Sequence, residues 1–439
     1  MDLLTGNLRK LFFKYLMPAI GSAVVAVIYG CIDTIAMGQG VGPDGTAGCA
    51  IFMPVFYTMD FLSVLFGTGG AVLYSKARGE GKKEKSNAFF TATVLFALTL
   101  SLLIWICLLL FQEPIYRFFG CDDHLLPFTR DYGLPIILAF PAFIFTGIFG
   151  SFVRNDENPN LVVTATVIGA VLNILGDWLF VFPLQMGMLG AGLATAIGGL
   201  SQCLILSFHF LRKKNSLRLV KPFRFLPACR KIIVNGFGAG FSNLAVIAIA
   251  FIINNQIMKY SGSDALAVYG MIGTISSLFM GIFNGIGQAS QPIISSNLGA
   301  GQTDRCRHVF RLGMTTACIF GLLSAALCIA IPLPITALFM KMTPGVEAIA
   351  PFILSVYALS FFPLGINIFI SMYLQSVMEA RSAALIAILR GLGVSGILLY
   401  VLPLFLEGDG IWWAVAIAEY AVAVFAICYM IRYRRTHAA

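Results

Sequence analysis

An amide and a carboxylate lie four residues apart inside a long apolar stretch of the sequence. Asp177 is the one charged residue between Leu161 and Phe182, and Asn173 precedes it by about one helical turn. An α-helix places residues at this spacing on one face. A carboxylate near the bilayer centre costs about 2.5 to 3.5 kcal/mol to insert, so it usually faces a helix-bundle interior or a water-filled cavity. The pair is therefore a candidate ion site centred on Asp177. The alternative is that Asn173 hydrogen-bonds a neighbouring helix and Asp177 belongs to a buried ion pair.

Other ionisable side chains inside apolar stretches are few. Asp33 lies toward the outer end of the first stretch, where it is a second candidate for the ion site or an interfacial carboxylate in contact with water. Arg390 and Glu419 lie at comparable depth on neighbouring antiparallel stretches, which predicts a structural ion pair rather than a site. Asp60 lies inside the second stretch, and the sequence assigns it no role.

The composition is that of a polytopic membrane protein. Of 439 residues, 59% are hydrophobic and 11% charged, and the mean hydropathy is +0.88, far above what a water-soluble domain needs. The net charge of +9 does not indicate a nucleic-acid partner, because nearly all Lys and Arg residues fall between the apolar stretches. The ten cysteines show no paired spacing, so neither a disulfide framework nor a zinc site is expected.

Enzymatic motifs are also missing from the sequence. It contains no Gly-x-Ser-x-Gly, His-Glu-x-x-His or Walker sequence, and its four histidines share no neighbourhood. We therefore expect no enzymatic activity and no organic cofactor. Without a nucleotide-binding loop, any uphill transport must draw on an ion gradient.

Twelve apolar segments are each long enough to cross a hydrocarbon core of about 30 Å as a helix. With both termini in the cytoplasm, 24 of the 29 Lys and Arg residues fall on the cytoplasmic side and four on the other, as the positive-inside rule requires. This predicts a multi-pass protein of the cell (inner) membrane. The segments are about 14–38, 48–75, 88–111, 126–153, 160–183, 188–211, 231–259, 265–295, 308–331, 346–376, 382–405 and 410–431.

The second half of the chain repeats the first at an offset of 220 residues. Adding this number takes Gly79 and Gly81 to Gly299 and Gly301. Eight basic residues and no acidic one lie between the halves, as expected of a cytoplasmic linker. The prediction is an all-α integral membrane fold of two pseudo-symmetric six-helix lobes, a geometry typical of transporters. The lobes are predicted at residues 1–211 and 232–439, with the basic cytoplasmic linker at 212–231.

Several short segments along the whole chain, together with the duplicated halves, resemble the multidrug and toxic compound extrusion (MATE) family. This family belongs to the multidrug/oligosaccharidyl-lipid/polysaccharide exporter superfamily, and the pattern is closest to its bacterial staphylococcal-type branch. The segments are Asp33-Thr34, Gly79-Glu-Gly81-Lys, Gln288-Ala-Ser-Gln291-Pro292, Leu389-Arg390-Gly391 and Gly410-Ile411-Trp412 followed by Glu419.

The resemblance implies a cation-coupling site in the N-terminal lobe. Asp33, Asn173, Asp177 and Thr195 stand where several relatives bind their coupling cation, and Pro18 matches a proline of their first helix that can act as a hinge. Thr195 could instead hydrogen-bond its own helix. Like charges in a poorly hydrated pocket favour a proton or a sodium ion between them, and the sequence does not choose between the two ions. No other metal is expected.

The function implied is a secondary active antiporter that exports amphipathic, cationic drugs in exchange for H+ or Na+. The alternative within the superfamily is a flippase for lipid-linked precursors, and a channel or receptor is less favoured. Four amides on otherwise apolar segments of the second half line the substrate cavity or connect helices. The expected partners are small-molecule drugs and the lipid bilayer, without nucleic acid, and the chain is expected to be a monomer. The four amides are Asn254, Asn255, Asn284 and Gln288.

Overall fold

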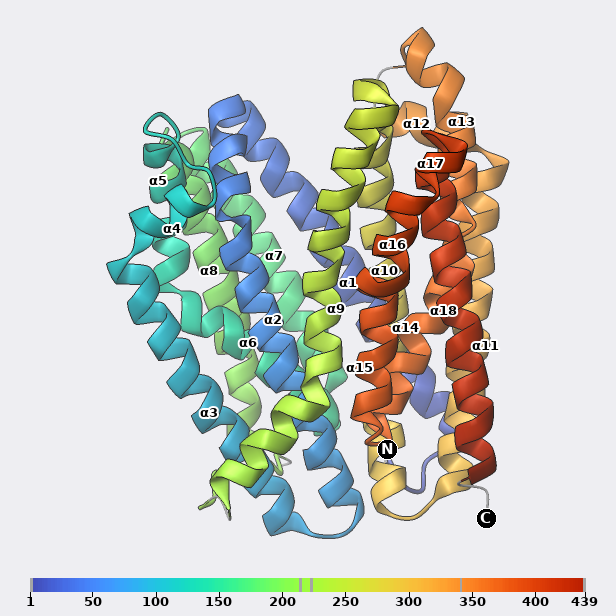
Figure 1. Cartoon of the computed structure of the whole chain (residues 1–439). Coiled ribbons are helices and arrows are strands. Elements are labelled where there is room, and N and C mark those ends of the chain that lie inside the picture. The colour runs from blue at the N-terminus through green and yellow to red at the C-terminus, as the bar shows by residue number, and fades with distance from the viewer. Residues whose placement is uncertain (1–2, 213–214, 222–223, 340–341, 437–439) are drawn as a thin grey trace. The chain divides into compact units, whose positions relative to one another are not determined.

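The computed structural model describes residues 3–212, 215–221, 224–339 and 342–436, and these residues form helices and connecting turns without a β-strand (Figure 1). Of the predicted linker, Lys213, Lys214 and Pro222 lie outside the described residues. The all-α prediction is confirmed.

Each predicted span corresponds to one helix or to consecutive helices. In the first half these are α1 (Leu8–Gly40), α2 (Pro43–Gly79), α3 (Lys83–Leu110), the short α4 (Gln112–Phe118), α5 (Leu126–Leu138), α6 (Phe140–Asn155), α7 (Pro159–Val181), α8 (Gly187–Ser207) and η1 (Phe208–Leu211). In the second half they are α9 (Phe225–Tyr260), α10 (Gly262–Gly299), α11 (Thr303–Ala330), α12 (Pro332–Phe339), α13 (Pro344–Ala358), α14 (Phe361–Ser376), α15 (Ala380–Ile388), η2 (Leu389–Gly393), α16 (Val394–Val401), α17 (Pro403–Leu406) and α18 (Asp409–Thr436).

The described residues include ten stretches that are long and apolar enough to cross a membrane, and an eleventh if the bent pair α5 and α6 counts as one span. The remaining predicted span is α9, a helix of 36 residues. The bend of 52° between α5 and α6 falls just before Pro141, because proline cannot donate the backbone hydrogen bond that would continue the preceding helix. The fold is therefore a multi-pass membrane bundle.

The helices divide into two compact units. The N-terminal unit comprises Met1–Thr5, Met17–Gly236 and Ser295–Gly301, and the C-terminal unit comprises Gly6–Leu16, Phe237–Ile294 and Gln302–Ala439. The start of α1 thus belongs to the C-terminal unit, and the start of α9, its counterpart at an offset of 220, belongs to the N-terminal unit. The lobe boundaries at residues 211 and 232 stay a prediction.

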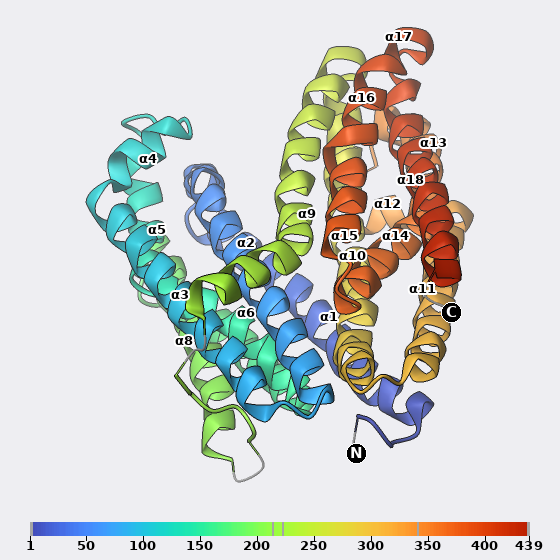
Figure 2. The same cartoon turned by 60° about the horizontal axis from the view of Figure 1, so that its bottom comes forward.

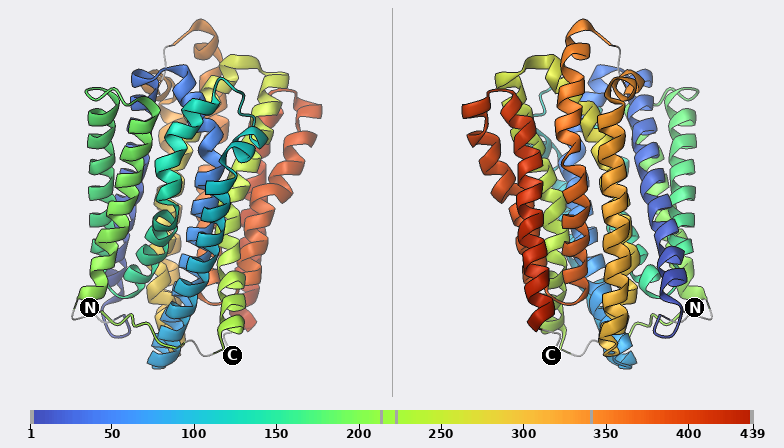
Figure 3. Two further views of the ribbon diagram at one scale, coloured as in Figure 1. Left: turned by 90° about the vertical axis from the view of Figure 1, so that its left-hand side faces the viewer. Right: turned by 90° about the vertical axis from the view of Figure 1, so that its right-hand side faces the viewer.

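Small residues allow close helix packing within the N-terminal unit. The first turns of α9 lie across α2 (Figure 2), and a Cβ added at Gly236 would collide with the carbonyl oxygen of Leu65. The ends of α2 and α10 meet through Gly79 and Gly299, and a Cβ on either would collide with a carbonyl oxygen of the other helix. α7 and α8 lie side by side in Figure 3. These contacts are of the small-residue kind common between membrane helices.

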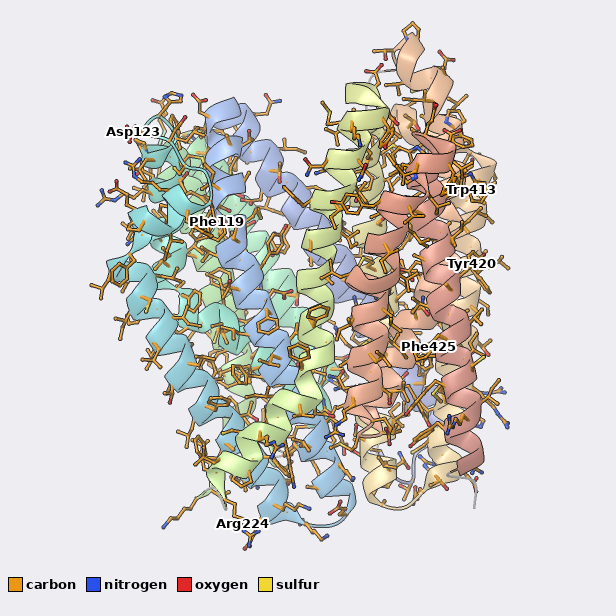
Figure 4. All side chains as sticks on the ribbon, in the orientation of Figure 1. Phe119, Asp123, Arg224, Trp413, Tyr420 and Phe425 are labelled. Atoms are coloured by element: carbon orange, nitrogen blue, oxygen red, sulfur yellow. The ribbon has the colours of Figure 1, made fainter. Side chains whose placement is uncertain are left out.

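In the C-terminal unit, α14 packs against α11 and α18, and α18 also packs against α16. Trp413, Tyr420 and Phe425 lie along α18 in Figure 4, and 37 to 43% of each side chain is exposed. Large exposed apolar side chains on a membrane helix suit contact with lipid. Trp413 and Tyr420 are seven residues apart and so share one face of α18, whereas Phe425 lies on another part of its exposed surface.

A buried carboxylate, Asp156, connects the linker to the helices of the N-terminal unit. Asp156, between α6 and α7, has a side chain only 1% exposed and forms an ion pair with Arg78. The backbone N–H of Ser216 in the linker donates to Asp156 Oδ2 at 3.0 Å, and the Ser216 hydroxyl also donates to Asp156. The linker is thus anchored to this unit.

His209 completes the shell around Asp156. Its Nε2 lies 2.8 Å from Asp156 Oδ2, and Asn158 Nδ2 lies 3.1 Å from its Nδ1. An amide N–H donates to Nδ1, so the proton of a neutral imidazole is on Nε2 and donates to the carboxylate. Burial alone would raise the pKa of Asp156, but hydrogen bonds from His209 and Ser216 and the charge of Arg78 lower it to about 2.

Candidate functional site

Three helices of the N-terminal unit carry the predicted cation site: α1 holds Asp33, α7 holds Asn173 and Asp177, and α8 holds Thr195. Gly176 and Gly198 lie at close contacts between α7 and α8. A Cβ at Gly176 would come within 2.8 Å of Ala194, and one at Gly198 within 2.9 Å of the carbonyl oxygen of Gly169. Because neither residue has a side chain, the polar groups of the two helices can meet.

The structure brings all four predicted residues together. Asn173 Nδ2 donates to Thr195 Oγ1 at 3.3 Å. The carboxyl group of Asp33 lies within hydrogen-bonding range of both Asp177 and Thr195. The side chain of Thr195 therefore faces the other three residues.

Four oxygen atoms at this site are buried and accept no hydrogen bond from the part of the chain that the structure describes. Asn173 and Asp177 are only 2% and 1% exposed. Among the described residues, no group donates a hydrogen bond to Asp33 Oδ1, to Asn173 Oδ1 or to either carboxylate oxygen of Asp177. A buried acceptor without a donor costs about 1 to 3 kcal/mol, and more when it is charged. Two facing carboxylates are stable there only when one is protonated or a cation lies between them.

Tyr132 of α5 forms part of the wall of this site. Its side chain is 1% exposed and lies within hydrogen-bonding range of Cys49 and Thr195. Its ring contacts Phe52 edge to face, with 5.7 Å between the centroids. The sequence did not indicate Tyr132, because an uncharged tyrosine in an apolar segment gives no signal of its own.

Pro18 lies inside α1, which is one continuous helix from Leu8 to Gly40. It is about 22 Å along the helix from Asp33. Along the chain, the change from the C-terminal to the N-terminal unit falls between Leu16 and Met17, directly before this proline. A hinge at Pro18 stays a prediction.

The four predicted substrate-binding amides lie on α9 and α10 of the C-terminal unit. Asn254 and Asn255 are exposed, whereas Asn284 and Gln288 are half-buried. Asn255 Nδ2 donates to the carbonyl oxygen of Phe251 at 2.8 Å, a bond within its own helix. Their role in substrate binding stays a prediction.

The C-terminal unit contains a different carboxylate arrangement. Arg390 Nε donates to Glu419 Oε1 at 3.0 Å, and the side chains are 13% and 11% exposed. Asn367 Nδ2 donates to Glu419 Oε2 at 2.7 Å and to the Glu419 carbonyl oxygen at 2.9 Å. The structure therefore brings the predicted pair together and adds Asn367 as a second donor.

A family model described as MatE matches residues 18–179 and, a second time, residues 239–401. The chain belongs to the MatE family. The two matches are offset by about 220 residues, as the repeat in the sequence predicted. Membership of this transporter family means that the chain is a membrane transporter and not an enzyme.

Two bacterial relatives match most or nearly all of the chain. "Multidrug export protein MepA" of Staphylococcus saprophyticus is 24% identical over 436 residues, covering 97% of this chain and 95% of the relative. "Probable multidrug resistance protein YoeA" of Bacillus subtilis is 23% identical over 316 residues, covering 70% and 68%. The structure titled "Outward-facing conformation of a multidrug resistance MATE family transporter of the MOP superfamily" superposes with a TM-score of 0.91 at 19% identity, covering 97% of this chain and 96% of that one. The structural match supports the fold.

The atoms around Asp33 and Asp177 that could coordinate an ion limit which ions the site can bind. The described residues include no group of three or more His, Cys, Asp or Glu side chains that could hold a metal ion. The two carboxyl groups and the side-chain oxygens of Asn173 and Thr195 offer only oxygen atoms as ligands. Oxygen ligands suit a hard cation such as Na+ or a shared proton.

Proposed function

We propose that this MatE-family chain is a secondary active efflux antiporter that exports amphipathic, cationic organic compounds in exchange for H+ or Na+. The names of the MepA and YoeA relatives support multidrug export. The observation that carries the coupling part is the pair of facing carboxyl groups, Asp33 and Asp177. Asp33 Oδ1 and both oxygens of Asp177 are buried and accept no hydrogen bond from a described residue. Such a pair requires a proton or a cation, and an ion gradient can supply either.

The coupling site consists of Asp33, Asn173, Asp177 and Thr195. The bound ion neutralises the carboxylates and draws α1 toward α7 and α8. When the ion leaves, repulsion between the carboxylates favours a different packing of α1, and Pro18 gives that helix a point at which to bend. Drug and ion then favour opposite packings, with a coupling free energy of about 1 to 3 kcal/mol.

The test uses purified protein in lipid vesicles loaded with a fluorescent cationic dye. An imposed proton or sodium gradient should drive dye transport by the wild type, and the gradient that works identifies the ion. Asp33→Asn and Asp177→Asn should each abolish this transport while dye still binds at equilibrium. Asp304→Asn is the matched control, because its side chain is 94% exposed at the start of α11 and the same charge is lost outside the site.

Two results would contradict the proposal. Full gradient-driven transport by both site variants, at normal protein levels, would remove Asp33 and Asp177 from coupling. Dye flux that follows only the dye gradient, with no response to either ion gradient in the wild type, would indicate a channel.

A further inference from the structure

One carboxylate in a membrane span is not part of the coupling site. Asp60 lies on α2, 16 residues after Asp44 and 19 before Gly79, which bound the apolar stretch. These separations correspond to about 24 Å and 28 Å along the helix. Asp60 is therefore near the middle of a hydrocarbon core about 30 Å thick. The single methylene of an aspartate is too short to carry its carboxylate to either interface.

The side chain of Asp60 is nevertheless exposed. A carboxylate in contact with lipid at this depth would be costly, so ionisable groups in membrane spans face the bundle interior or a water-filled path, where protein groups or a charged ligand can interact with them. Exposure and depth together indicate that this face of α2 meets something other than hydrocarbon.

Two tyrosines accompany Asp60. Tyr57 lies on the same face of α2, one turn earlier, and is 38% exposed. Tyr29 of α1 lies close enough to interact with the charges of both Asp60 and Asp33. All of these residues belong to the N-terminal unit. An exposed carboxylate is thus accompanied by phenol rings from two helices.

This combination fits a particular ligand chemistry. A carboxylate in a poorly hydrated environment attracts a positive charge, and tyrosine rings add cation–π attraction of about 0.5 to 2 kcal/mol. Aromatic walls with a few polar groups are typical of sites for small organic molecules. A calcium or magnesium ion would need more oxygen ligands than Asp60 and two phenols provide, and an anion would be repelled.

We propose that Asp60, with Tyr29 and Tyr57, forms a docking subsite for the positive charge of an organic cation on the N-terminal unit. The proposal rests on the proposed export of organic cations and adds the residue that selects for charge. Because Tyr29 is near both Asp60 and Asp33, a cation at Asp60 also disfavours a positive charge at Asp33. Substrate and coupling ion would then oppose each other electrostatically.

The test measures equilibrium binding of ethidium, a permanent cation, and of uncharged chloramphenicol to the purified full-length protein. Asp60→Asn should raise the Kd for ethidium by about tenfold and leave the Kd for chloramphenicol unchanged. Asp44→Asn is the matched control, because it removes the same charge from the first turn of the same helix, where the side chain is 49% exposed. Asp60→Glu should restore most of the affinity, and Tyr57→Phe should bind ethidium better than Tyr57→Leu.

Each other outcome has a defined meaning. Equal ethidium affinity in Asp60→Asn and Asp44→Asn would overturn the subsite. Loss of affinity for both ligands in Asp60→Asn without rescue by glutamate would show a structural role and would also overturn it. Failure of the wild type to bind or transport either compound would overturn the proposed function itself, whereas ethidium transport by Asp60→Asn at the wild-type KM would overturn only the subsite.

Discussion

Asp177 in the N-terminal unit and Glu419 in the C-terminal unit are both buried carboxylates inside membrane spans, but their hydrogen-bond partners differ. Glu419 accepts from Arg390 at 3.0 Å and from Asn367 at 2.7 Å. Neither oxygen of Asp177 accepts a hydrogen bond from a described residue, and Asp177 faces another carboxyl group, Asp33.

This difference separates a structural charge from a coupling charge. When hydrogen-bond donors and a positive charge come from the protein itself, the charge of a carboxylate is balanced permanently. The positions of the carboxylate and its partners are then fixed as well. A carboxylate whose neutralisation is left to a proton or a cation changes its interactions each time that ion binds or leaves. The arrangement of Glu419 therefore suits a support within its unit, and that of Asp177 suits an exchangeable ion.

The largest expected effect on stability comes from removing the partner of Glu419. Arg390→Met leaves a buried charge without its ion-pair partner, so the free energy of unfolding should fall by about 3 to 5 kcal/mol. Thermal unfolding of the purified protein measures this as a lower Tm. The double variant Arg390→Met with Glu419→Met should recover most of the loss, because a buried ion pair can often be replaced by apolar residues of similar volume. An unchanged Tm in Arg390→Met would remove the structural role of the pair.

Much of the membrane fold could be predicted from the sequence, because the bilayer restricts it strongly. Long apolar segments must be helices in lipid, and charges inside them are rare enough to draw attention to Asp33, Asp177, Arg390 and Glu419. The repeat of 220 residues then gave the two halves, and the second family match repeats the first at about this distance.

Features that depend on three-dimensional packing could not be predicted. Asp156 lies in a turn, where a carboxylate in the sequence usually faces water, and only the packing of the linker against α2, α6 and η1 shows that it is buried. Asn367 lies inside an apolar segment, and its contact with Glu419 joins residues 52 positions apart, a pairing that the sequence does not give. Tyr132 lies within hydrogen-bonding range of Thr195, and this contact between α5 and α8 is one that sequence periodicity does not give.

Asp156 extends the comparison to two buried carboxylates of the N-terminal unit. Asp156 accepts hydrogen bonds from His209 and Ser216, whereas Asp177 accepts none from a described residue. The Asp156 pKa of about 2 lies below the value of about 3.9 expected in an unfolded chain, so its interactions stabilise the folded state by about 2 kcal/mol at neutral pH. This stabilisation is present above about pH 4 and is lost as the pH falls toward 2.

Asp156→Asn should therefore lower the Tm at pH 7, and the difference from wild type should shrink as the pH falls below about 5. Asp304→Asn, whose side chain is 94% exposed, is the control and should leave the Tm unchanged. A difference between Asp156→Asn and wild type that stays constant down to pH 3 would show that the charge of Asp156 does not contribute.

A smaller effect is expected at Thr195. Thr195→Val keeps the shape of the side chain but removes the acceptor for Asn173 Nδ2, so the free energy of unfolding should fall by about 1 kcal/mol. Thr195→Ser keeps the hydroxyl and should restore the Tm more fully than Thr195→Val. Equal Tm values for the valine and serine variants would show that the hydrogen bond contributes no stability.

The smallest change in stability, and the one that most sharpens the comparison, is expected at Asp177. Asp177→Asn removes a buried charge that accepts no hydrogen bond from the described residues, and it relieves the repulsion with Asp33. Its free energy of unfolding should stay within about 1 kcal/mol of the wild-type value or rise, so its Tm should not fall appreciably, although we expect gradient-driven transport to be lost. Glu419→Gln makes the same chemical change at a carboxylate with donors and should lower the Tm, because Arg390 then remains buried without a counter-charge. Opposite signs for the two variants would establish that the units use their buried carboxylates differently. Equal losses of Tm would contradict this, because they would show that the charge of Asp177 also stabilises its unit.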